Sequence, residues 1–257
     1  MNSFRHISRN GFKFLVSGNV DAEEFESCIP QLDALIGSGK ILKDSQTTTA
    51  ALCEIPGCGH VFIKRTNQKG FRFILRYIFR SARAFRAAAV IRILSRNGIE
   101  TPALTAVGEH RSCFLILQAG YLITECKQDA SESHRFLVRM ENPEQGLNDF
   151  LPKASALLAE IHKLNIVHGD YKLPNIYQLP DGTCGTWDLD GASVSGSPLS
   201  IRKRLIDLKR LLRSAEAVCK RRNLPFDRSR FAELIVHSYS SLFPELERPL
   251  GSALKRG

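Results

Sequence analysis

The sequence predicts an α+β protein in which a small, antiparallel β-rich lobe precedes a compact helical lobe. Short β-prone runs separated by polar turns occupy most of the segment from residue 39 to residue 126. Beyond it, apolar residues recur at intervals of three and four, the spacing of one helix face. With 257 residues, 43% of them hydrophobic and 24% charged, the composition is that of a globular protein with a substantial core.

Three β-prone runs joined by polar turns open the first lobe and favour antiparallel hairpins; they cover residues 39–43, 47–55 and 60–65. An alanine-rich helix is predicted from about Ser81 to Asn97, with Gly98 at the position where helices commonly end. Further strands are expected at residues 101–107, 113–117 and 121–126. This order makes residues 38–126 the first lobe and leaves residues 1–37 as an N-terminal extension.

The second lobe, residues 127–246, is predicted to be mainly helical. Apolar periodicity indicates a long helix from Phe150 to Leu164 and two later helices around residues 205–212 and 231–242. Between them, the segment from Ile176 to Asp188 has the pattern of a β-hairpin with its turn at residues 180–182. Residues 247–257 form a basic tail in this division.

The positive charge of the chain is concentrated in one segment. The formal net charge is +10, and between Ile55 and Ile99 there are ten Lys and Arg residues but no Asp or Glu. The remaining 26 basic residues are matched by 26 acidic ones. If the alanine-rich helix began near Phe71, four basic residues would form one stripe along it: Arg72, Arg76, Arg80 and Arg83. Such a stripe is typical of a surface that meets an anionic membrane or a phosphorylated ligand.

Cysteine usage and hydropathy favour a cytosolic protein. The seven cysteines are odd in number and scattered, so we expect free thiols and no structural disulfide. Cys53, Cys58 and His60 are close enough to suggest a metal site, but no second ligand pair follows at zinc spacing, which favours a turn between two strands. No run of about eighteen apolar residues is present, so no membrane span is expected.

The segment VHGDYKLPN, residues 167–175, has the clearest chemical meaning. It places Asp170 and Asn175 five residues apart with Lys172 between them, directly after the long predicted helix. The antiparallel hairpin that follows would bring Asn175 and Asp188 to the same end, next to the loop that bears Asp170. Converging carboxylate and amide oxygens suit Mg²⁺, a hard cation that also bridges the phosphates of a nucleotide.

These residues resemble the catalytic loop of protein-kinase-like enzymes, in which an Asp is followed by Lys two positions later and by Asn five positions later. His168 stands where that loop has its histidine, Gly169 replaces the usual arginine, and WDLD resembles the metal-binding segment. The chain is similar to the bacterial lipopolysaccharide core kinases, which phosphorylate heptose or Kdo sugars, through its basic helix, the turn GIETP and the segment RKRLIDLKRLLRS. This resemblance covers about residues 38–246 and implies a two-lobed, protein-kinase-like fold.

The resemblance also implies ATP and Mg²⁺ as cofactors and a role for each loop residue. Asp170 would accept the proton of the acceptor hydroxyl or orient that hydroxyl. Lys172 would steady the transferring phosphoryl group, while Asn175 and Asp188 would hold Mg²⁺.

On the nucleotide side, the resemblance implies that Lys64 in VFIKR holds the α- and β-phosphates and that the backbone of Glu125 and Cys126 meets adenine. Two features depart from the kinase pattern. The phosphate-covering segment KDSQTTT, residues 43–49, contains no glycine, so Ser and Thr hydroxyls would substitute for its backbone contacts. The helix after Lys64 lies in the acid-free segment and offers no glutamate to pair with that lysine.

The expected acceptor is a sugar or another small molecule, because the chain after Asp188 is short and has no A-P-E segment for a peptide platform. An anionic glycolipid, the lipopolysaccharide core, would also explain the basic stripe, since membrane phosphates near the acceptor could dock there. We therefore expect a cytoplasmic protein that is peripheral on the inner membrane. No nucleic-acid partner is expected, because no nucleic-acid-binding motif accompanies the basic charge.

Two alternatives stay open: a catalytically impaired pseudokinase scaffold, and a small atypical protein kinase, since such kinases share the HGD loop. Asp207 in LIDLKRLL either pairs with an arginine or braces the catalytic loop. His168 is expected to be a hydrogen-bonding scaffold with no chemical step, and Trp187 to pack in its strand.

Overall fold

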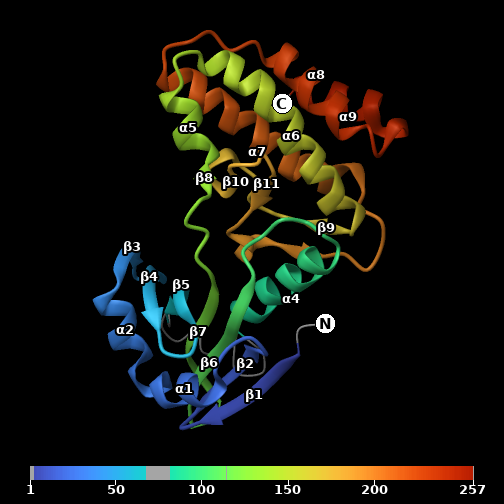
Figure 1. The fold of residues 1–257 in the computed structure, drawn as a ribbon. Coiled ribbons are helices and arrows are strands. Elements are labelled where there is room, and N and C mark those ends of the chain that lie inside the picture. Colours follow the sequence, from blue (N-terminus) through green and yellow to red (C-terminus); the bar gives the residue numbers. More distant parts are fainter. Residues whose placement is uncertain (1–2, 68–81, 114, 257) are drawn as a thin grey trace. The chain divides into compact units, whose positions relative to one another are not determined.

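The structure is a computed structural model that describes residues 3–67, 82–113 and 115–256 (Figure 1). The chain divides into two compact units, one built on a β-sheet and one mainly helical. The strand unit consists of Met1–Arg92 and Pro102–Lys127, and the helical unit consists of Ile93–Thr101 and Gln128–Gly257. An antiparallel sheet that precedes a helical region confirms the predicted α+β class.

Among the described residues, seven strands form the antiparallel sheet of the strand unit, in the order β1-β2-β6-β7-β5-β4-β3. Their bounds are β1 Phe4–Arg9, β2 Phe12–Ser17, β3 Lys40–Ser45, β4 Thr48–Ile55, β5 Gly59–Asn67, β6 Leu104–Ser112 and β7 Ile116–Glu125. The three predicted runs at residues 39–65 correspond to β3, β4 and β5. The prediction of separate strands at residues 113–117 and 121–126 was wrong: Cys113 lies in a turn with φ of 48°, and one strand, β7, runs through both.

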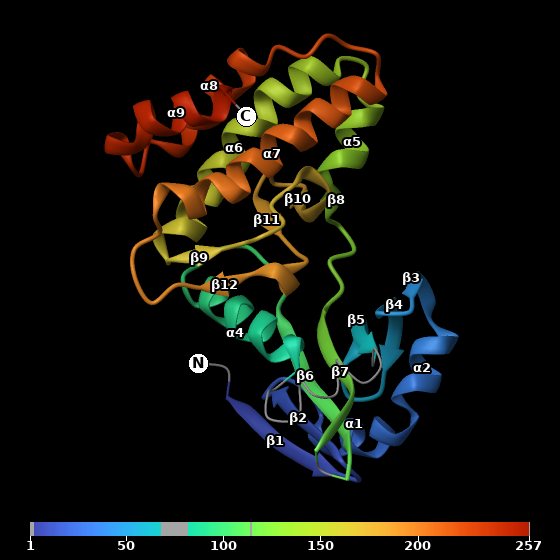
Figure 2. The same cartoon turned by 180° about the vertical axis from the view of Figure 1, so that it is seen from behind.

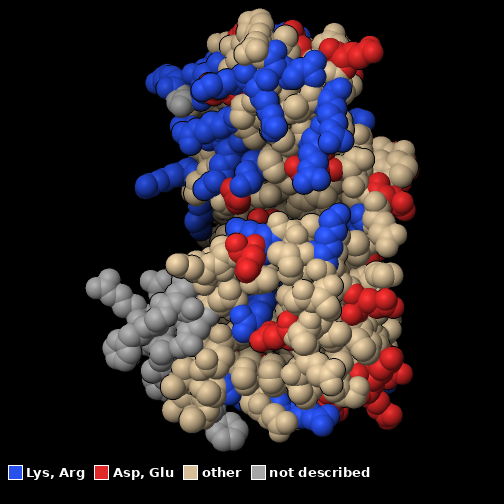
Figure 3. Space-filling view, turned by 90° about the vertical axis from the view of Figure 1, so that its left-hand side faces the viewer, with Lys and Arg blue, Asp and Glu red and all other residues tan. Residues whose placement is uncertain are grey.

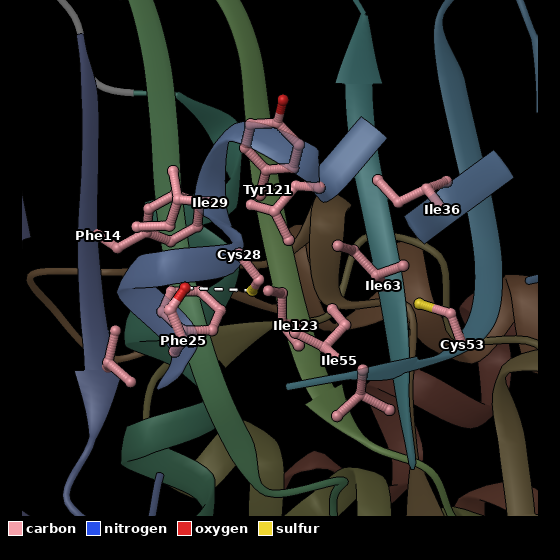
Figure 4. Close-up of a cluster of buried hydrophobic side chains, with 14 of the residues drawn as sticks. Phe14, Phe25, Cys28, Ile29, Ile36, Cys53, Ile55, Ile63, Tyr121 and Ile123 are labelled. Atoms are coloured by element: carbon pink, nitrogen blue, oxygen red, sulfur yellow. Dashed lines mark hydrogen bonds between the residues drawn. The ribbon is translucent and has the colours of Figure 1, made fainter. Parts of the chain in front are cut away.

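Two short helices cover one face of this sheet: α1 (Ala22–Cys28) and α2 (Leu32–Ser38), joined by the 3-10 turn η1 (Ile29–Gln31). Asp21 caps α1 by accepting hydrogen bonds from two backbone N–H groups of its first turn at 3.1 Å. Apolar side chains from helices and sheet form one buried cluster (Figure 4), which includes Phe14, Phe25, Ile29, Ile36, Ile55, Ile63 and Ile123. This cluster is the core of the strand unit.

Residues 1–37 are part of the strand unit, although we expected an extension. Asn10 and Gly11 form the turn between β1 and β2, with φ of 49° and 81°. Tight hairpins require such positive φ angles, and Asn-Gly is the sequence that adopts them most readily. The hairpin then extends the sheet, because β2 pairs with β6.

The helix α4 (Arg83–Arg96) follows β5 and agrees with the prediction for residues 81–97 within its described part. Gly98 has φ of 71°, as expected just beyond a helix end. Ala82, immediately before α4, packs against Leu117, and a Cβ atom on Gly120 would lie 2.7 Å from the Cβ of Ala82. A start near Phe71 falls outside the described residues.

The helical unit is built around the long helix α6 (Figure 2). Its helices are α5 Ser133–Arg139, α6 Pro143–Lys163, α7 Ile201–Arg221, α8 Arg228–Tyr239 and α9 Glu247–Lys255. Their buried apolar residues include Leu151, Leu158, Leu208, Leu212 and Ile235. Residues 247–255, expected in a basic tail, form α9, with Leu250 and Leu254 buried. Within the described ranges, no helix has the length and apolar character that crossing a membrane requires.

Two small sheets complete the helical unit. One contains β8 (Ser131–Glu132), β10 (Ile176–Gln178) and β11 (Cys184–Thr186), and the other pairs β9 (Ile166–Val167) with β12 (Ser193–Val194). β10 and β11 confirm the predicted hairpin. Glu100 joins the segment after α4 to this hairpin, because its Oε1 accepts a hydrogen bond from the Tyr177 hydroxyl at 2.9 Å and its carbonyl oxygen accepts one from the Thr186 N–H at 3.1 Å.

Candidate active site

The loop after α6 contains a close approach of two backbone segments at Gly169. Gly169 has φ of 79°, and a Cβ atom placed on it would lie 2.5 Å from the carbonyl oxygen of Gly191. A side chain there would meet both a strained backbone and a steric clash. The pairing of Val167 in β9 with Ser193 in β12 holds these segments together. The packing therefore explains why glycine stands where the resembled kinase loop has arginine.

Asp207 of α7 fixes the backbone of this loop. Its Oδ2 accepts a hydrogen bond from the N–H of His168, and its Oδ1 accepts one from the N–H of Gly169, both at 2.8 Å. Oδ2 also lies 3.2 Å from Nε2 of His162 on α6, and the carboxylate is fully buried. These partners compensate the cost of burying the carboxylate. Of the two roles left open for Asp207, the structure supports bracing of the loop.

His168 is a hydrogen-bonding scaffold, as expected. Burial lowers the pKa of its ring and favours the neutral form. The N–H of Asp170 donates to Nδ1 at 3.4 Å, so Nε2 is the donor to Oγ1 of Thr186 at 2.8 Å. Thr186 in turn donates to the carbonyl oxygen of Asn175 at 2.9 Å. Both ring nitrogens are thus used to position the loop against β11.

Three side chains converge on the carboxylate of Asp170. The Nζ of Lys172 lies 2.9 Å from Oδ2, and Nδ2 of Asn175 donates to the same oxygen at 3.1 Å. The other oxygen, Oδ1, accepts a hydrogen bond from NH1 of Arg210 on α7 at 2.8 Å. The structure thus brings together Asp170, Lys172 and Asn175, which were singled out by their spacing, and adds a second cation.

Sequence reasoning missed Arg210. A usable signal was nevertheless present, because Arg210 follows Asp207 by three residues and so lies on the neighbouring turn of the same helix. Once Asp207 is placed under the loop, this spacing puts Arg210 beside it. The kinase resemblance specifies residues of the loop itself and none on α7.

Asn175 and Asp188 lie at the same end of the hairpin, as predicted. Ile176 is opposite Thr186 in the register, and the N–H of Trp187 donates to the carbonyl oxygen of Asn175 at 3.1 Å. Asp188 is exposed and has left-handed backbone angles, φ 57° and ψ 55°. Such strained angles occur often at functional sites.

Trp187 packs within the hairpin. Its indole ring stacks on Tyr177 with the ring centroids 4.6 Å apart, and its Nε1–H donates to the carbonyl oxygen of Pro174 at 2.9 Å. This confirms the expected strand-packing role and leaves the neighbouring Asp188 as the polar group at this end.

The oxygen donors at this end of the hairpin fit a magnesium ion. Because Nδ2 of Asn175 donates to Asp170, its Oδ1 is the amide atom that would contact a cation. Together with the exposed carboxylate of Asp188, it offers hard oxygen ligands that phosphate oxygens and water would complete. Among the described residues, no group of three or more His, Cys, Asp or Glu side chains could hold a metal ion. Cys53 lies in β4 and His60 in β5, and Cys58 stands in the turn that joins these two strands.

Lys64 lies in an interior strand of the sheet, because β5 pairs with β4 on one side and with β7 on the other. Its neighbour Ile63 belongs to the cluster under α1 and α2, and Nε of Arg65 lies 2.8 Å from Oδ1 of Asp33 on α2. Side chains alternate along a strand, so the half-buried Lys64 points to the opposite face.

The glycine-free turn between β3 and β4 is closed by side chains. The Ser45 hydroxyl donates to the carbonyl oxygen of Thr48 at 3.0 Å, and its oxygen accepts from the Thr48 N–H at 3.2 Å. Thr49 donates to Asp44 at 2.9 Å, and the Asn67 amide of β5 donates to the Ser45 carbonyl oxygen at 3.1 Å. The hydroxyls expected near the phosphates therefore also maintain the turn.

Glu125 and Cys126 stand at the end of β7. The N–H of Glu125 donates to the carbonyl oxygen of Ala103 at 2.9 Å, and its side chain lies 3.2 Å from Nζ of Lys127. This N–H is therefore engaged within the strand unit. A backbone contact with adenine would instead use the Glu125 carbonyl oxygen or the backbone of Cys126.

The predicted basic stripe is described only in part. Arg83 is the first residue of α4 and is exposed. Its expected companions Arg72, Arg76 and Arg80 lie outside the described residues.

An antiparallel sheet unit, a helical unit and a loop of the form HGDxKxxN define the class of the protein, a protein-kinase-like phosphotransferase. The sequence model of the Lipopolysaccharide kinase (Kdo/WaaP) family matches residues 45–236, and the chain belongs to this family. It is therefore a kinase that uses ATP, and within the kinases it is a lipopolysaccharide core kinase. A search of curated proteins found no match.

Proposed function

We propose that the protein transfers the γ-phosphoryl group of ATP to a hydroxyl of a heptose or Kdo sugar in the lipopolysaccharide inner core. The observation that carries this proposal is the arrangement around Asp170. Lys172 and Asn175 hold Oδ2, the buried Asp207 braces the preceding backbone, and Oδ1 lies on the α7 side. A carboxylate fixed in this way suits the orientation of an attacking hydroxyl.

In this mechanism, Oδ1 of Asp170 orients the acceptor hydroxyl and takes its proton as the oxygen attacks the γ-phosphorus. The bond from the γ-phosphorus to the β–γ bridging oxygen breaks, and ADP leaves with that oxygen. Lys172, with Nζ 2.9 Å from Oδ2, stabilises the negative charge of the transferring phosphoryl group. The loop residues do no covalent chemistry. They position the hydroxyl and balance charge, which is what phosphoryl transfer requires of a protein.

The remaining groups hold the nucleotide. Asn175 and Asp188 would bind Mg²⁺, which neutralises phosphate charge when bound. Lys64 would hold the α- and β-phosphates, and the backbone at Glu125 and Cys126 would meet adenine. The hydroxyls of the β3–β4 turn would lie over the phosphates in place of glycine N–H groups.

The test uses purified protein, ATP, Mg²⁺ and core oligosaccharide stripped of phosphate. The wild-type protein should give a phosphorylated product, and mass spectrometry of its fragments should assign the sugar and the hydroxyl. Asp170→Ala should reduce kcat by about a thousandfold or more, because the hydroxyl loses both its orienting group and its proton acceptor. Asp181→Asn, which changes an exposed carboxylate at the turn of the neighbouring hairpin, is the matched control and should retain most activity.

The same preparation distinguishes the alternatives. A pseudokinase scaffold would be stabilised thermally by ATP and Mg²⁺ but would transfer phosphate to no core acceptor. An atypical protein kinase would label a protein substrate in preference to the oligosaccharide. Unchanged turnover in Asp170→Ala would contradict the mechanism.

We also propose that the protein is peripheral on the inner membrane, with the basic stripe that includes Arg83 facing anionic headgroups. Net positive charge and a glycolipid acceptor support this placement. Binding to vesicles that contain anionic phospholipid should weaken as salt is raised, and neutral vesicles should bind poorly.

A further inference from the structure

The helix α7 carries an excess of positive charge next to the catalytic loop. Within Ile201–Arg221, all of which the structure describes, eight residues are basic, and Asp207 and Glu216 are the acidic ones. Asp207 is buried under the loop, so Glu216 is the acid that this helix exposes. Figure 3 shows Lys and Arg crowding the helical unit, with few Asp or Glu among them.

A shallow, open pocket lies along one face of α7, and one of its lining residues, Arg210, contacts Asp170. Among the described residues, its lining consists of four cations, Arg202, Lys209, Arg210 and Arg213, with three aliphatic side chains of the same helix. Ile206, at the centre of this face, is 44% exposed. Cations that surround apolar surface suit a ligand with an acidic group on a carbon skeleton, such as an acidic sugar.

Arg210 connects this pocket to the reacting group. Its NH1 donates to Oδ1 of Asp170, whereas Lys172 and Asn175 contact the other oxygen, Oδ2. The guanidinium side chain is 47% exposed, more than that of Asp170 at 28%. Arg210 therefore lies at the accessible side of the oxygen that the acceptor hydroxyl would approach.

We propose that Arg210 is a specificity-determining residue that recognises an acidic group, carboxylate or phosphate, on the acceptor sugar near the hydroxyl to be phosphorylated. This rests on the proposed function. The acid pairs with the guanidinium of Arg210, with Lys209 and Arg213 close by, and Oδ1 of Asp170 is then shared with the acceptor hydroxyl. Arg210 exchanges the carboxylate of Asp170 for the acid of the sugar, and Asp170 keeps Lys172 as its cationic partner. Neither charge is therefore left uncompensated. A neutral sugar provides no such partner and leaves Arg210 on Asp170.

The position of Arg210 favours the acceptor over the nucleotide as the source of this acid. Lys172 and Asn175 contact Oδ2, and Asn175 with Asp188 belongs to the metal end of the hairpin. Arg210 instead contacts Oδ1 from α7, together with the exposed aliphatic surface that a sugar skeleton would cover. A phosphate of ATP has no apolar part that could cover that aliphatic surface.

The experiment measures kcat and KM of the full chain with three acceptors: core oligosaccharide from a strain that lacks this kinase, its carboxyl-reduced form and its dephosphorylated form. Arg210→Met keeps the aliphatic stem and removes the charge. It should raise KM for the intact oligosaccharide about ten- to a hundredfold, the loss expected for one charge-assisted hydrogen bond. KM for ATP should stay within twofold of wild type. Arg210→Lys should recover part of the loss.

The comparison of the three acceptors identifies which acid is recognised, the carboxylate or the phosphate. Wild type should discriminate against whichever form lacks the recognised carboxylate or phosphate, and Arg210→Met should lose that discrimination. The matched control, Lys220→Met, removes one exposed charge from the same helix outside the pocket and should behave like wild type. An equal rise in KM for all acceptors, or a rise in KM for ATP instead, would overturn the proposal.

A binding measurement separates this inference from the proposed function. Wild type and Arg210→Met are each titrated calorimetrically with two ligands, the intact oligosaccharide and a neutral form that is both carboxyl-reduced and dephosphorylated. This measurement of binding needs no turnover. Absence of transfer by wild type would refute the proposed function, while charge-dependent binding lost in Arg210→Met would still support the recognition role. Equal binding of acidic and neutral oligosaccharide by wild type would reject that role.

Discussion

The turn between β3 and β4 and the loop that bears Asp170 are stabilised in opposite ways, although both are assigned to phosphate chemistry. The turn depends on hydroxyl and amide side chains, from Ser45, Thr49 and Asn67, that lie in its own or the next two strands and are partly exposed. The loop depends on Asp207, a fully buried carboxylate almost forty residues later in the chain.

This difference indicates which region tolerates change. Partly exposed hydrogen bonds within one sheet can be replaced by water, so each contributes little and its loss stays local. A buried carboxylate with two backbone donors has no such replacement, because its removal leaves buried N–H groups unsatisfied. The turn between β3 and β4 can therefore vary without loss of the fold, whereas the geometry of the loop is part of the folding of the helical unit.

The largest effect is expected for Asp207→Ala. It removes the acceptor of the His168 and Gly169 N–H groups and should lower the free energy of unfolding by about 3 kcal/mol or more. Urea unfolding followed by circular dichroism measures this change, and phosphoryl transfer should fall with it. Glu216→Ala is the control on the same helix, since its exposed carboxylate lies 3.8 Å from Arg228 and should contribute under about 1 kcal/mol. Similar stability of the two variants would show that the buried carboxylate contributes no more than the exposed one.

The next effect concerns pH. His162 on α6 and His168 in the loop that bears Asp170 are both buried, and burial lowers the pKa of each ring from its ordinary value of 6.5. Below about pH 6.5 the unfolded chain therefore binds more protons than the folded one, and stability decreases as the pH falls. The slope should approach about 1 kcal/mol per pH unit for each ring that stays neutral.

Unfolding free energies at pH 7.5, 6.5 and 5.5 test this expectation. His168→Gln retains a donor toward Thr186 but does not titrate, so its slope should be shallower than that of wild type. Equal stability of the wild-type protein at pH 7.5 and 5.5 would show that neither buried ring resists protonation.

The smallest effect is expected at the turn. Ser45→Ala removes two hydrogen bonds to the Thr48 backbone at a partly exposed site and should reduce stability by about 1 kcal/mol or less. KM for ATP should rise a few-fold with kcat nearly unchanged, because in the proposed mechanism the turn contacts the nucleotide and takes no part in proton transfer. Ser27→Ala, the same change on exposed α1, is the control. A loss of kcat as large as that in Asp207→Ala would abolish the distinction between turn and loop.

The parts of the site that could be predicted are those encoded locally. The spacing of Asp170, Lys172 and Asn175 and the hairpin that ends at Asp188 depend on neighbouring residues, so a pattern in one segment was sufficient. The contacts made by Asp207 and Arg210 join segments about forty residues apart, and no local pattern specifies which face of α7 meets the loop.

The N-terminal segment shows a different kind of failure. Asn10 and Gly11 between two runs of alternating polarity are a strong hairpin signal, although they lie outside the region that resembles a kinase. That β2 then joins β6 could not have been predicted, because the pairing depends on tertiary packing. Long-range pairing is the part of a sheet that a single sequence leaves unspecified.

The bond between Asp207 and the loop backbone also has a consequence for amide exchange. The N–H groups of His168 and Gly169 are bonded to a carboxylate inside the helical unit, so they should become accessible to deuterium only when α7 separates from the loop. Their exchange would then report the cooperative opening of the whole unit. The ordered backbone of the loop and the packing of the surrounding helices would be lost together. No intermediate would keep the helices intact around a disordered loop.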